Sequence, residues 1–265
     1  MSESRKLDQF YTKRSVAEYC YKILSEKFYL NNYLLLEPSA GSGSFSDLFH
    51  KNSVSYDLDP KSDSILKQDF LLLGTKELSQ QNVFVIGNPP FGKNSSLALK
   101  FFNKSAEFAN YIAFILPKTF KKESVINKLN EYFHLIEEID LPENSFVFDG
   151  EDYNVPCVFQ VWVKKSIKRE KIVSRKESDL FKFVKKDDAD FAIRRVGGLA
   201  GKVIENFEDY KEPSHYYIKV NEKKISKQDL IKKIQSIYPE LQKLAKYSAG
   251  NPSLSKGELI KELEK

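Results

Sequence analysis

Short apolar runs alternate with amphipathic stretches over the first 165 residues. The spacing of Val16, Tyr19, Ile23 and Leu24 predicts a helix from Ser15 to Phe28. Apolar runs predict strands near residues 33–37, 54–58, 82–87, 110–116, 134–140 and 155–164. Further helices are expected near residues 43–50, 95–109 and 120–133. Alternating strands and helices predict a parallel sheet with helices on both faces, and ligands bind such sheets at the carboxyl ends of the strands.

The pattern is weaker beyond Lys165. Strands are expected at residues 167–173 and 180–184, and a helix over 226–247 that Pro239 breaks. Residues 192–202 are basic and rich in glycine, which suits either a clamp for backbone phosphates or a hairpin with an exposed arginine pair. A last short helix is expected to open at Ser255. We therefore predict a catalytic domain over residues 1–165 and a separate C-terminal region over 166–265.

A glycine-rich turn follows the first apolar strand, in the order Glu37-Pro38-Ser39-Ala40-Gly41-Ser42-Gly43. Gly41 and Gly43 let a ligand approach the backbone closely. The turn is not a dinucleotide fingerprint, because Ser46 stands where a third glycine is needed, and no Gly-Lys-Ser/Thr of a phosphate loop follows. Glu37 would repel a phosphate and attract a cation. S-adenosylmethionine, which carries an ammonium and a sulfonium group, suits this turn.

Two acidic positions come next along the chain. Asp57 ends the second strand, where an acidic residue typically holds ribose hydroxyls. Asp69 and Phe70 come next and could bracket an adenine, with the carboxylate accepting from its amine and the ring against its face. Asp59, beside Pro60, is interpreted as a turn residue. Each carboxylate alone could be a solvated loop residue, but their order favours a nucleoside-binding site.

The run Asn88-Pro89-Pro90-Phe91 follows the apolar strand Val83 to Ile86. The Asn88 side-chain oxygen and the Pro89 carbonyl can each accept one N–H of a planar amine. This pulls the nitrogen toward a tetrahedral shape and aims its lone pair at an electrophile. The prolines preset the carbonyl direction, and Phe91 offers a stacking face worth roughly 1–3 kcal/mol per base. The alternative is an ordinary turn, since Asn-Pro punctuates many loops.

These segments, in this order, resemble the adenine-N6 DNA methyltransferases that use S-adenosylmethionine. Asp8-Gln9-Phe10-Tyr11-Thr12 looks like the amino-terminal segment with which that family closes over the cofactor. The resemblance covers roughly residues 8 to 165. It implies a Rossmann-like methyltransferase fold, an α/β architecture whose mixed, mostly parallel sheet has the run 155–163 as its antiparallel member. It also implies the following cofactor-binding residues: Phe10, Tyr11, Thr12, Glu37, Pro38, Ser39, Ala40, Gly41, Gly43, Asp57, Leu58, Asp69, Phe70 and Asn88.

The same resemblance places an aromatic residue just before the antiparallel strand, against the second face of a flipped base. Phe148 is the expected residue and Phe146 the alternative, although both could instead be core residues. The segment that follows, with Asp149, Glu151 and Asp152, is longer and more acidic than the family pattern. The predicted catalytic set is Asn88, Pro89, Pro90, Phe91 and Phe148.

Charge is distributed unevenly along the chain. Residues 1–163 hold 17 Lys and Arg against 21 Asp and Glu, whereas residues 164–265 hold 25 against 16. A basic excess after the catalytic segments predicts contact with a polyanion, with Lys93, Arg194, Arg195 and Lys202 as candidates. The alternative is an ordinary solvated surface rich in lysine.

Composition excludes several other classes. Cys20 and Cys157 lie far apart and the three histidines are scattered, so we expect a reduced compartment and no metal site. The first twenty residues alternate charge and polarity, and the longest apolar stretch, near 112–116, is too short for a membrane span. A cytoplasmic location is therefore expected.

The sequence thus predicts methyl transfer from S-adenosylmethionine to the N6 amine of adenine in DNA. The Asn-Pro-Pro-aromatic segment is also found in enzymes that methylate RNA adenine, guanine or protein glutamine, so an RNA adenine or a protein glutamine methyltransferase remains an alternative. A non-catalytic nucleic-acid-binding subunit is a further one. The C-terminal region is small, so a partner subunit could supply sequence specificity or an endonuclease for restriction-modification.

Overall fold

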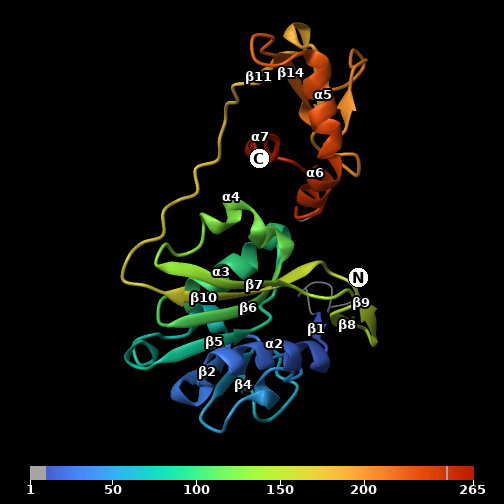
Figure 1. The fold of residues 1–265 in the computed structure, drawn as a ribbon. Coiled ribbons are helices and arrows are strands. Elements are labelled where there is room, and N and C mark those ends of the chain that lie inside the picture. The colour runs from blue at the N-terminus through green and yellow to red at the C-terminus, as the bar shows by residue number, and fades with distance from the viewer. Residues whose placement is uncertain (1–9, 249) are drawn as a thin grey trace. The chain divides into compact units, whose positions relative to one another are not determined.

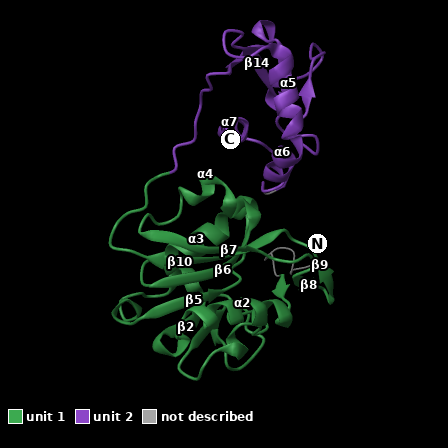
Figure 2. Ribbon diagram, viewed as in Figure 1, with its two compact units in different colours: residues 1–171 green, residues 172–265 purple. Residues whose placement is uncertain are grey.

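The computed structural model describes residues 10–248 and 250–265. Asp8 and Gln9 of the predicted amino-terminal segment therefore lie outside the described residues. The chain divides into two compact units, Met1–Lys171 and Ile172–Lys265 (Figure 2). The sequence analysis placed this boundary after residue 165. The first unit extends further because the Arg169 guanidinium donates hydrogen bonds to the backbone carbonyls of Phe133, Ile126 and Leu129.

A seven-stranded sheet forms the centre of the first unit, in the order β4-β3-β2-β5-β6-β10-β7 (Figure 1). Its strands are β2 (Leu34–Glu37), β3 (Val54–Asp57), β4 (Leu66–Lys67), β5 (Val83–Gly87), β6 (Tyr111–Pro117), β7 (Phe133–Asp140) and β10 (Cys157–Lys164). The strands from β4 to β6 pair in parallel, whereas β10 runs antiparallel to both of its neighbours. This is the predicted Rossmann-like methyltransferase fold, with its antiparallel member where the sequence placed it.

Helices cover both faces of this sheet. Phe28, directly after α2 (Arg14–Lys27), packs edge-on against Phe84 and Tyr111. Phe102 of α3 (Ser96–Ser105) packs edge-on against Trp162. Trp162 lies opposite Ile112, the neighbour of Tyr111 along β6. Because successive side chains of a strand point to opposite faces, α2 and α3 cover opposite faces of the sheet, as predicted.

Two predicted helices are wrong or much shorter than expected. Residues 43–50 contain only the 3₁₀ turn Ser46–Leu48, because Gly43 has a left-handed φ of 91° and begins a turn. Residues 120–133 contain the 3₁₀ segment Lys118–Lys121 and the single-turn helix α4 (Glu123–Ile126). There the Asn130 side chain accepts from the backbone N–H of Tyr132, a local bond that competes with the helical one.

A small second sheet, in the order β1-β8-β9, lies in the same unit. β1 (Tyr11–Thr12) pairs with β8 (Phe146–Phe148), which forms a hairpin with β9 (Glu151–Tyr153). The two residues between β8 and β9, Asp149 and Gly150, have φ angles of 50° and 83°. Two positive φ angles are what a tight two-residue hairpin turn of the primed type needs, and Asp-Gly is a favoured pair for it.

The second unit pairs an antiparallel sheet with helices. The sheet has the order β11-β14-β12-β13, built from β11 (Phe181–Val184), β12 (Phe191–Arg194), β13 (Val203–Ile204) and β14 (His215–Val220). The helices are α5 (Lys227–Ser236), α6 (Tyr238–Ala245) and α7 (Lys256–Leu263). Pro239 stands in the first turn of α6, so the predicted break is present. Ser255 and Glu258 form a capping box that opens the expected last helix.

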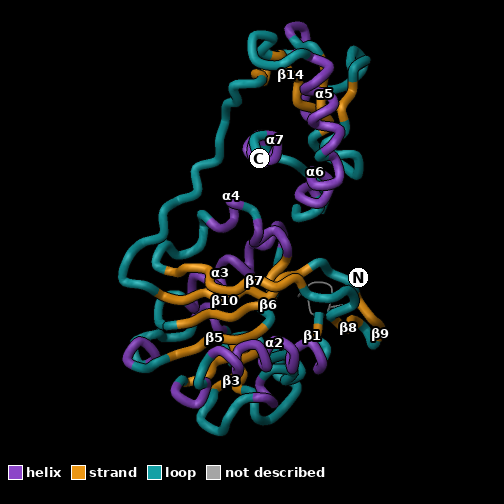
Figure 3. The backbone as a smooth tube through the Cα atoms, in the orientation of Figure 1, coloured by secondary structure: helices purple, strands orange, loops and turns teal. Residues whose placement is uncertain are grey.

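The segment between the two units is irregular (Figure 3). A strand was expected at residues 167–173, and this prediction is wrong, because no strand lies between Lys164 and Phe181. Of the described residues, none belong to a helix with the length and apolar character needed to cross a membrane.

Candidate active site

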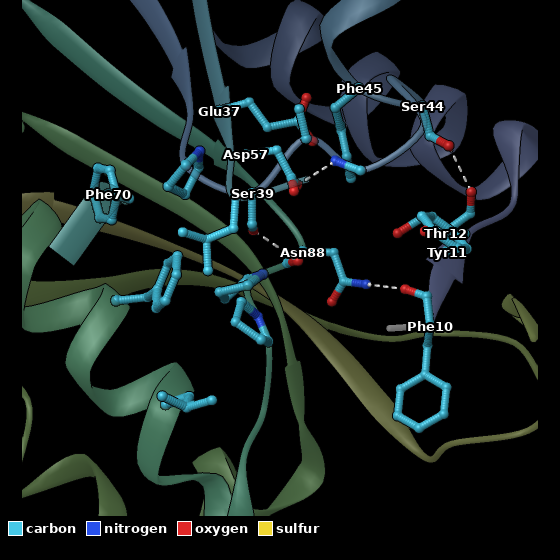
Figure 4. A pocket seen from close by; sticks show the side chains of 18 of the residues that line it. Phe10, Tyr11, Thr12, Glu37, Ser39, Ser44, Phe45, Asp57, Phe70 and Asn88 are labelled. Atoms are coloured by element: carbon cyan, nitrogen blue, oxygen red, sulfur yellow. Dashed lines mark hydrogen bonds between the residues drawn. The ribbon is translucent and has the colours of Figure 1, made fainter. Parts of the chain in front are cut away.

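A cavity of about 350 Å³ lies at the carboxyl ends of the central strands of the first unit (Figure 4). All predicted cofactor-binding residues except Gly43 line it, and so do Pro89, Pro90 and Phe91. Side chains from three separate strand ends, Glu37 of β2, Asp57 of β3 and Asn88 after β5, therefore reach one space. This is the arrangement expected when ligands bind at the carboxyl ends of parallel strands.

The glycine turn is fixed against β3 and β1. The Gly41 N–H donates to Asp57 Oδ2 at 2.7 Å, and the Asp59 N–H donates to Asp57 Oδ1 at 2.8 Å. A carboxylate can accept about four hydrogen bonds, so Asp57 keeps capacity for two hydroxyls of a ligand. Gly41 is left-handed, with φ 54°, and a Cβ there would stand 3.0 Å from the Tyr11 ring. Gly43 belongs to the same turn but does not line the cavity, and its N–H donates to the Ala40 carbonyl.

Glu37 is a buried carboxyl at the tip of β2. Its exposed fraction is 2%, and no group among the described residues bonds its Oε2. Burial raises the pKa of this carboxyl well above its ordinary value, because the charged form is poorly solvated there. A cationic ligand group beside it would compensate for that loss of solvation. Glu37 therefore suits an ammonium group.

Asp69 and Phe70 line the far part of the cavity. Asp69 caps the 3₁₀ segment Phe70–Leu72 by accepting the Leu71 N–H at 2.9 Å on Oδ1, which leaves its other oxygen for a ligand. The Phe70 ring is 1% exposed and stacks on Phe101 of α3, with ring centroids 5.4 Å apart. Phe70 therefore lines the cavity as one ring of an aromatic pair.

Asn88 is held by its backbone and by one end of its amide. Its carbonyl accepts from the Ser39 hydroxyl at 3.1 Å, and its Nδ2 donates to the Phe10 carbonyl at 3.4 Å. Its Oδ1 is buried, and the described part of the chain offers it no hydrogen-bond partner. A buried acceptor without a partner costs about 1–3 kcal/mol. A ligand that donates an N–H here would recover that cost.

The aromatic residues near Asn88 form two groups. Phe91 lines the cavity and packs edge-on against Phe146, which is fully buried, so the alternative candidate Phe146 is a core residue. Phe148 is half-buried and is not among the lining residues. Its ring packs instead against Phe10 and Tyr153, at 5.7 and 5.6 Å between centroids. Contact between Phe148 and a base stays a prediction.

Several lining residues were not singled out from the sequence. They are Ser42, Ser44, Phe45, Leu71, Leu97 and Phe101. Leu97 and Phe101 are four residues apart on α3 and therefore lie on the same face of the helix. This spacing is visible in the sequence, but it indicates the cavity only once the helix is placed next to Phe91. The Ser44 hydroxyl donates to the Thr12 carbonyl at 2.7 Å and so joins the glycine turn to β1, a contact without any signal in the sequence.

The candidate phosphate-binding residues fall in both units. Lys93 is exposed and follows the Asn-Pro-Pro-Phe segment in the first unit. Lys202 is exposed in the second unit, just before β13. These two cations are accessible to a polyanion in their own units.

The arginine pair is engaged within the second unit. The hairpin of one alternative is present, because β12 and β13 pair, but its arginine pair is half-buried and not exposed. The Arg194 Nε donates to the Val196 carbonyl at 2.8 Å, and the Arg195 guanidinium lies 5.2 Å from the centre of the Tyr216 ring. Arg195 is held there by a cation–π contact.

Comparisons with known proteins give limited similarity. No model of a known protein family matches the sequence. An alignment 139 residues long is 31% identical to Protein ENHANCED DOWNY MILDEW 2 of Arabidopsis thaliana. It covers 46% of this chain and 10% of the length of that relative.

Two solved structures show likeness over part of the chain. A candidate RNA methyltransferase from Pyrococcus horikoshii is 15% identical, covers 60% of this chain and 87% of its own, and has a TM-score of 0.48. The 23S rRNA methyltransferase ErmE is 15% identical, covers 60% of this chain and 71% of its own, with a TM-score of 0.41. At identities and TM-scores this low, the fold assignment rests on the order and directions of the strands in the seven-stranded sheet.

Proposed function

We propose that this protein transfers a methyl group from S-adenosylmethionine to the N6 amine of adenine in DNA. The observation that carries the proposal is the Asn88 Oδ1, a buried acceptor with no described partner, in the cavity that Gly41 and Asp57 also line. An acceptor held beside a cavity that acidic and aromatic residues line suits the activation of a planar amine. A turn residue would have no need of it.

The residues of the cavity suit S-adenosylmethionine as the methyl donor. Glu37 would hold the ammonium group, because its Oε2 is buried and lacks a described partner. Asp57 would accept the ribose hydroxyls with the capacity that Gly41 and Asp59 leave. Asp69 would accept from the adenine amine. The cofactor supplies an electrophilic methyl group on sulfur.

The chain's own residues would activate the target amine. Asn88 Oδ1 and the Pro89 carbonyl would each accept one N–H, which localises the nitrogen lone pair and directs it at the methyl group. The amine nitrogen would take the methyl group from sulfur and become positively charged, and its proton would then leave to solvent, so no residue of the chain is needed as a general base. Phe91 would stack on the ring. An adenine within a duplex must first be flipped out, which costs a few kcal/mol.

The basic second unit supports a nucleic-acid substrate. Residues 172–265 hold 20 Lys and Arg against 15 Asp and Glu, whereas residues 1–171 hold 22 of each. The whole excess of positive charge therefore belongs to the second unit, and neutralising phosphates supplies most sequence-independent affinity. The choice of DNA rests on the order of the amino-terminal, cofactor and Asn-Pro-Pro-Phe segments in the sequence.

Tritium transfer from labelled cofactor to DNA, RNA and protein, followed by nucleoside analysis, tests the proposal. We expect label in N6-methyladenine from DNA. Label in N6-methyladenine from RNA alone would replace DNA by RNA as the substrate. Label in protein alone would favour a glutamine side chain, which presents the same planar NH₂ group.

A further inference from the structure

We propose that Phe10 is a positioning residue that sets the orientation of the Asn88 amide, and that the β8–β9 hairpin holds Phe10 in place. This inference rests on the proposed function, since the orientation matters only if Asn88 accepts from a target amine. Phe10 acts through its backbone carbonyl, and its ring is the part that the hairpin holds.

The amide of Asn88 has two possible orientations, related by a half-turn, and the chemistry of its neighbour selects one. A backbone carbonyl can only accept a hydrogen bond, so the group that faces the Phe10 carbonyl, 3.4 Å away, must be the amide nitrogen. The oxygen then points away from Phe10, and no described residue bonds it (Figure 4). In the opposite orientation the amide would present its NH₂ to the NH₂ of the target, and two donors cannot bond each other.

The position of the Phe10 carbonyl depends on where the Phe10 ring is held. The ring stacks on Tyr153 of β9, with centroids 4.7 Å apart and planes 6° from parallel. It also packs against Phe148 of β8 at 5.7 Å, and Phe148 and Tyr153 contact each other at 5.6 Å. Each aromatic pair of this kind contributes beyond the area that it buries. The rings of Phe148 and Tyr153 therefore hold the Phe10 ring from two sides.

The hairpin is itself tied to the chain that follows Phe10. Thr12 pairs with Phe146 across β1 and β8, and the Lys13 N–H donates to the Ser145 carbonyl at 3.1 Å. The Lys13 ammonium forms an ion pair with Asp152 Oδ1 at 2.6 Å. These contacts, together with the pairing of Tyr11 with Val147, hold the chain from Tyr11 onward. The aromatic contacts are the ones that reach Phe10 itself.

The β8–β9 hairpin therefore has a role at the site, although Phe148 and Tyr153 do not line the cavity. Weakening the hold on Phe10 would let its carbonyl move, and the Asn88 amide could then turn over. A shift of about 1 Å in a catalytic group can cost roughly 10²-fold in rate. The hydrogen bond is long at 3.4 Å in the free protein, and such bonds shorten when the substrate complex forms.

Steady-state kinetics of the full chain test this inference. Tyr153→Ala removes a ring that is 39% exposed, so the fold should persist. We expect kcat at saturating cofactor and DNA to fall at least about tenfold. Tyr153→Phe keeps the stacking ring and should restore the rate. Tyr29→Ala removes an 84% exposed ring elsewhere in the same unit and serves as the matched control.

A rise in the cofactor KM alone, with kcat unchanged at saturation, would overturn the inference, because the hairpin would then only hold the cofactor segment. A wild-type kcat in Tyr153→Ala would overturn it as well. Equal loss of kcat in Tyr153→Phe would also contradict it, since that variant keeps the stacked ring.

Nuclear magnetic resonance gives a readout that does not depend on activity. The Asn88 side-chain NH₂ signals, assigned by their loss in Asn88→Ala, should be protected from solvent exchange in the wild type and exposed in Tyr153→Ala. Unchanged protection would refute the role of the hairpin. If the wild type transfers no methyl group to any substrate, the proposed function fails, and this measurement still decides whether the hairpin orients the amide.

Discussion

Replacing Gly41 by alanine perturbs the glycine turn by a single methyl group. Gly41 has a φ of 54°, and a residue with a side chain pays roughly 1–2 kcal/mol for this left-handed conformation. The new Cβ would stand 3.0 and 3.1 Å from two atoms of the Tyr11 ring. Overpacking of this kind costs about 1–3 kcal/mol. The Tyr11 ring lines the cofactor cavity, so it can move aside only by changing the shape of that cavity.

We therefore expect two separable effects of Gly41→Ala. The backbone strain should lower the free energy of unfolding by about 1–2 kcal/mol, measured by denaturant titration. The displacement of Tyr11 should raise the Kd for S-adenosylmethionine roughly 5- to 150-fold, measured by calorimetry. Gly250→Ala is the matched control, because Gly250 has a φ of 84° and a Cβ there would meet nothing within 4 Å. It should cost stability without changing cofactor affinity.

A double-mutant cycle separates the clash from the strain. In a Tyr11→Ala background, Gly41→Ala should cost less cofactor affinity than it does in the wild type, because the ring that it displaces is gone. A folded Gly41→Ala variant that binds the cofactor with wild-type affinity would refute the placement of the cofactor at this turn.

Three further predictions follow from charged side chains. Burial raises the pKa of Glu37, so the folded chain holds this proton more tightly than the unfolded chain, and the stability of the wild type falls as pH rises. Glu37→Gln should therefore be more stable than the wild type at about pH 8 but not at about pH 4, and it should bind the cofactor more weakly. Arg169→Ala should lower the stability of the first unit by about 1–3 kcal/mol in thermal unfolding, because its guanidinium bonds three backbone carbonyls. DNA affinity should fall steeply with salt, and Lys202→Ala should flatten the slope of log affinity against log salt concentration by about one unit. Arg195→Ala should also destabilise the second unit, because its contact with Tyr216 is lost.

The strands of the first unit were predictable because burial on both faces leaves continuous apolar runs. Val83 to Ile86 is such a run, and it places Asn88 at a strand end without any tertiary information. Glu37 and Asp57 are the last residues of their strands. The parallel arrangement then brings all three side chains to one edge of the sheet. The residues at the strand ends that line the cavity could therefore be predicted from the local apolar pattern and from the parallel direction of the strands.

Other features depend on contacts between distant segments. The helix expected at residues 43–50 shows an apolar pattern, but the left-handed Gly43 and the 3₁₀ turn Ser46–Leu48 replace it. The bond between the Gly41 N–H and Asp57 joins the glycine turn to the end of β3 and has no local signature. The half-buried position of Arg195 likewise depends on Tyr216, which lies on another strand.

The β8–β9 hairpin could have been predicted. Asp149-Gly150 is a strong signal for a two-residue turn, and Phe148 and Tyr153 flank it at positions that suit paired strands. From the sequence, this segment was only described as longer and more acidic than the family pattern. The contact of this hairpin with Phe10 involves a residue more than a hundred positions earlier, and only the structure shows it.

Methyl transfer by the Asn88→Ala variant tests the central claim most directly. The account predicts that calorimetry gives a wild-type affinity for S-adenosylmethionine, because the Glu37 and Asp57 carboxylates are unchanged. Tritium transfer to adenine in DNA should fall roughly 10²- to 10³-fold, the usual loss when one preorganised polar contact is removed. A near-normal rate of transfer in this variant would mean that the target amine is held elsewhere and would contradict the account.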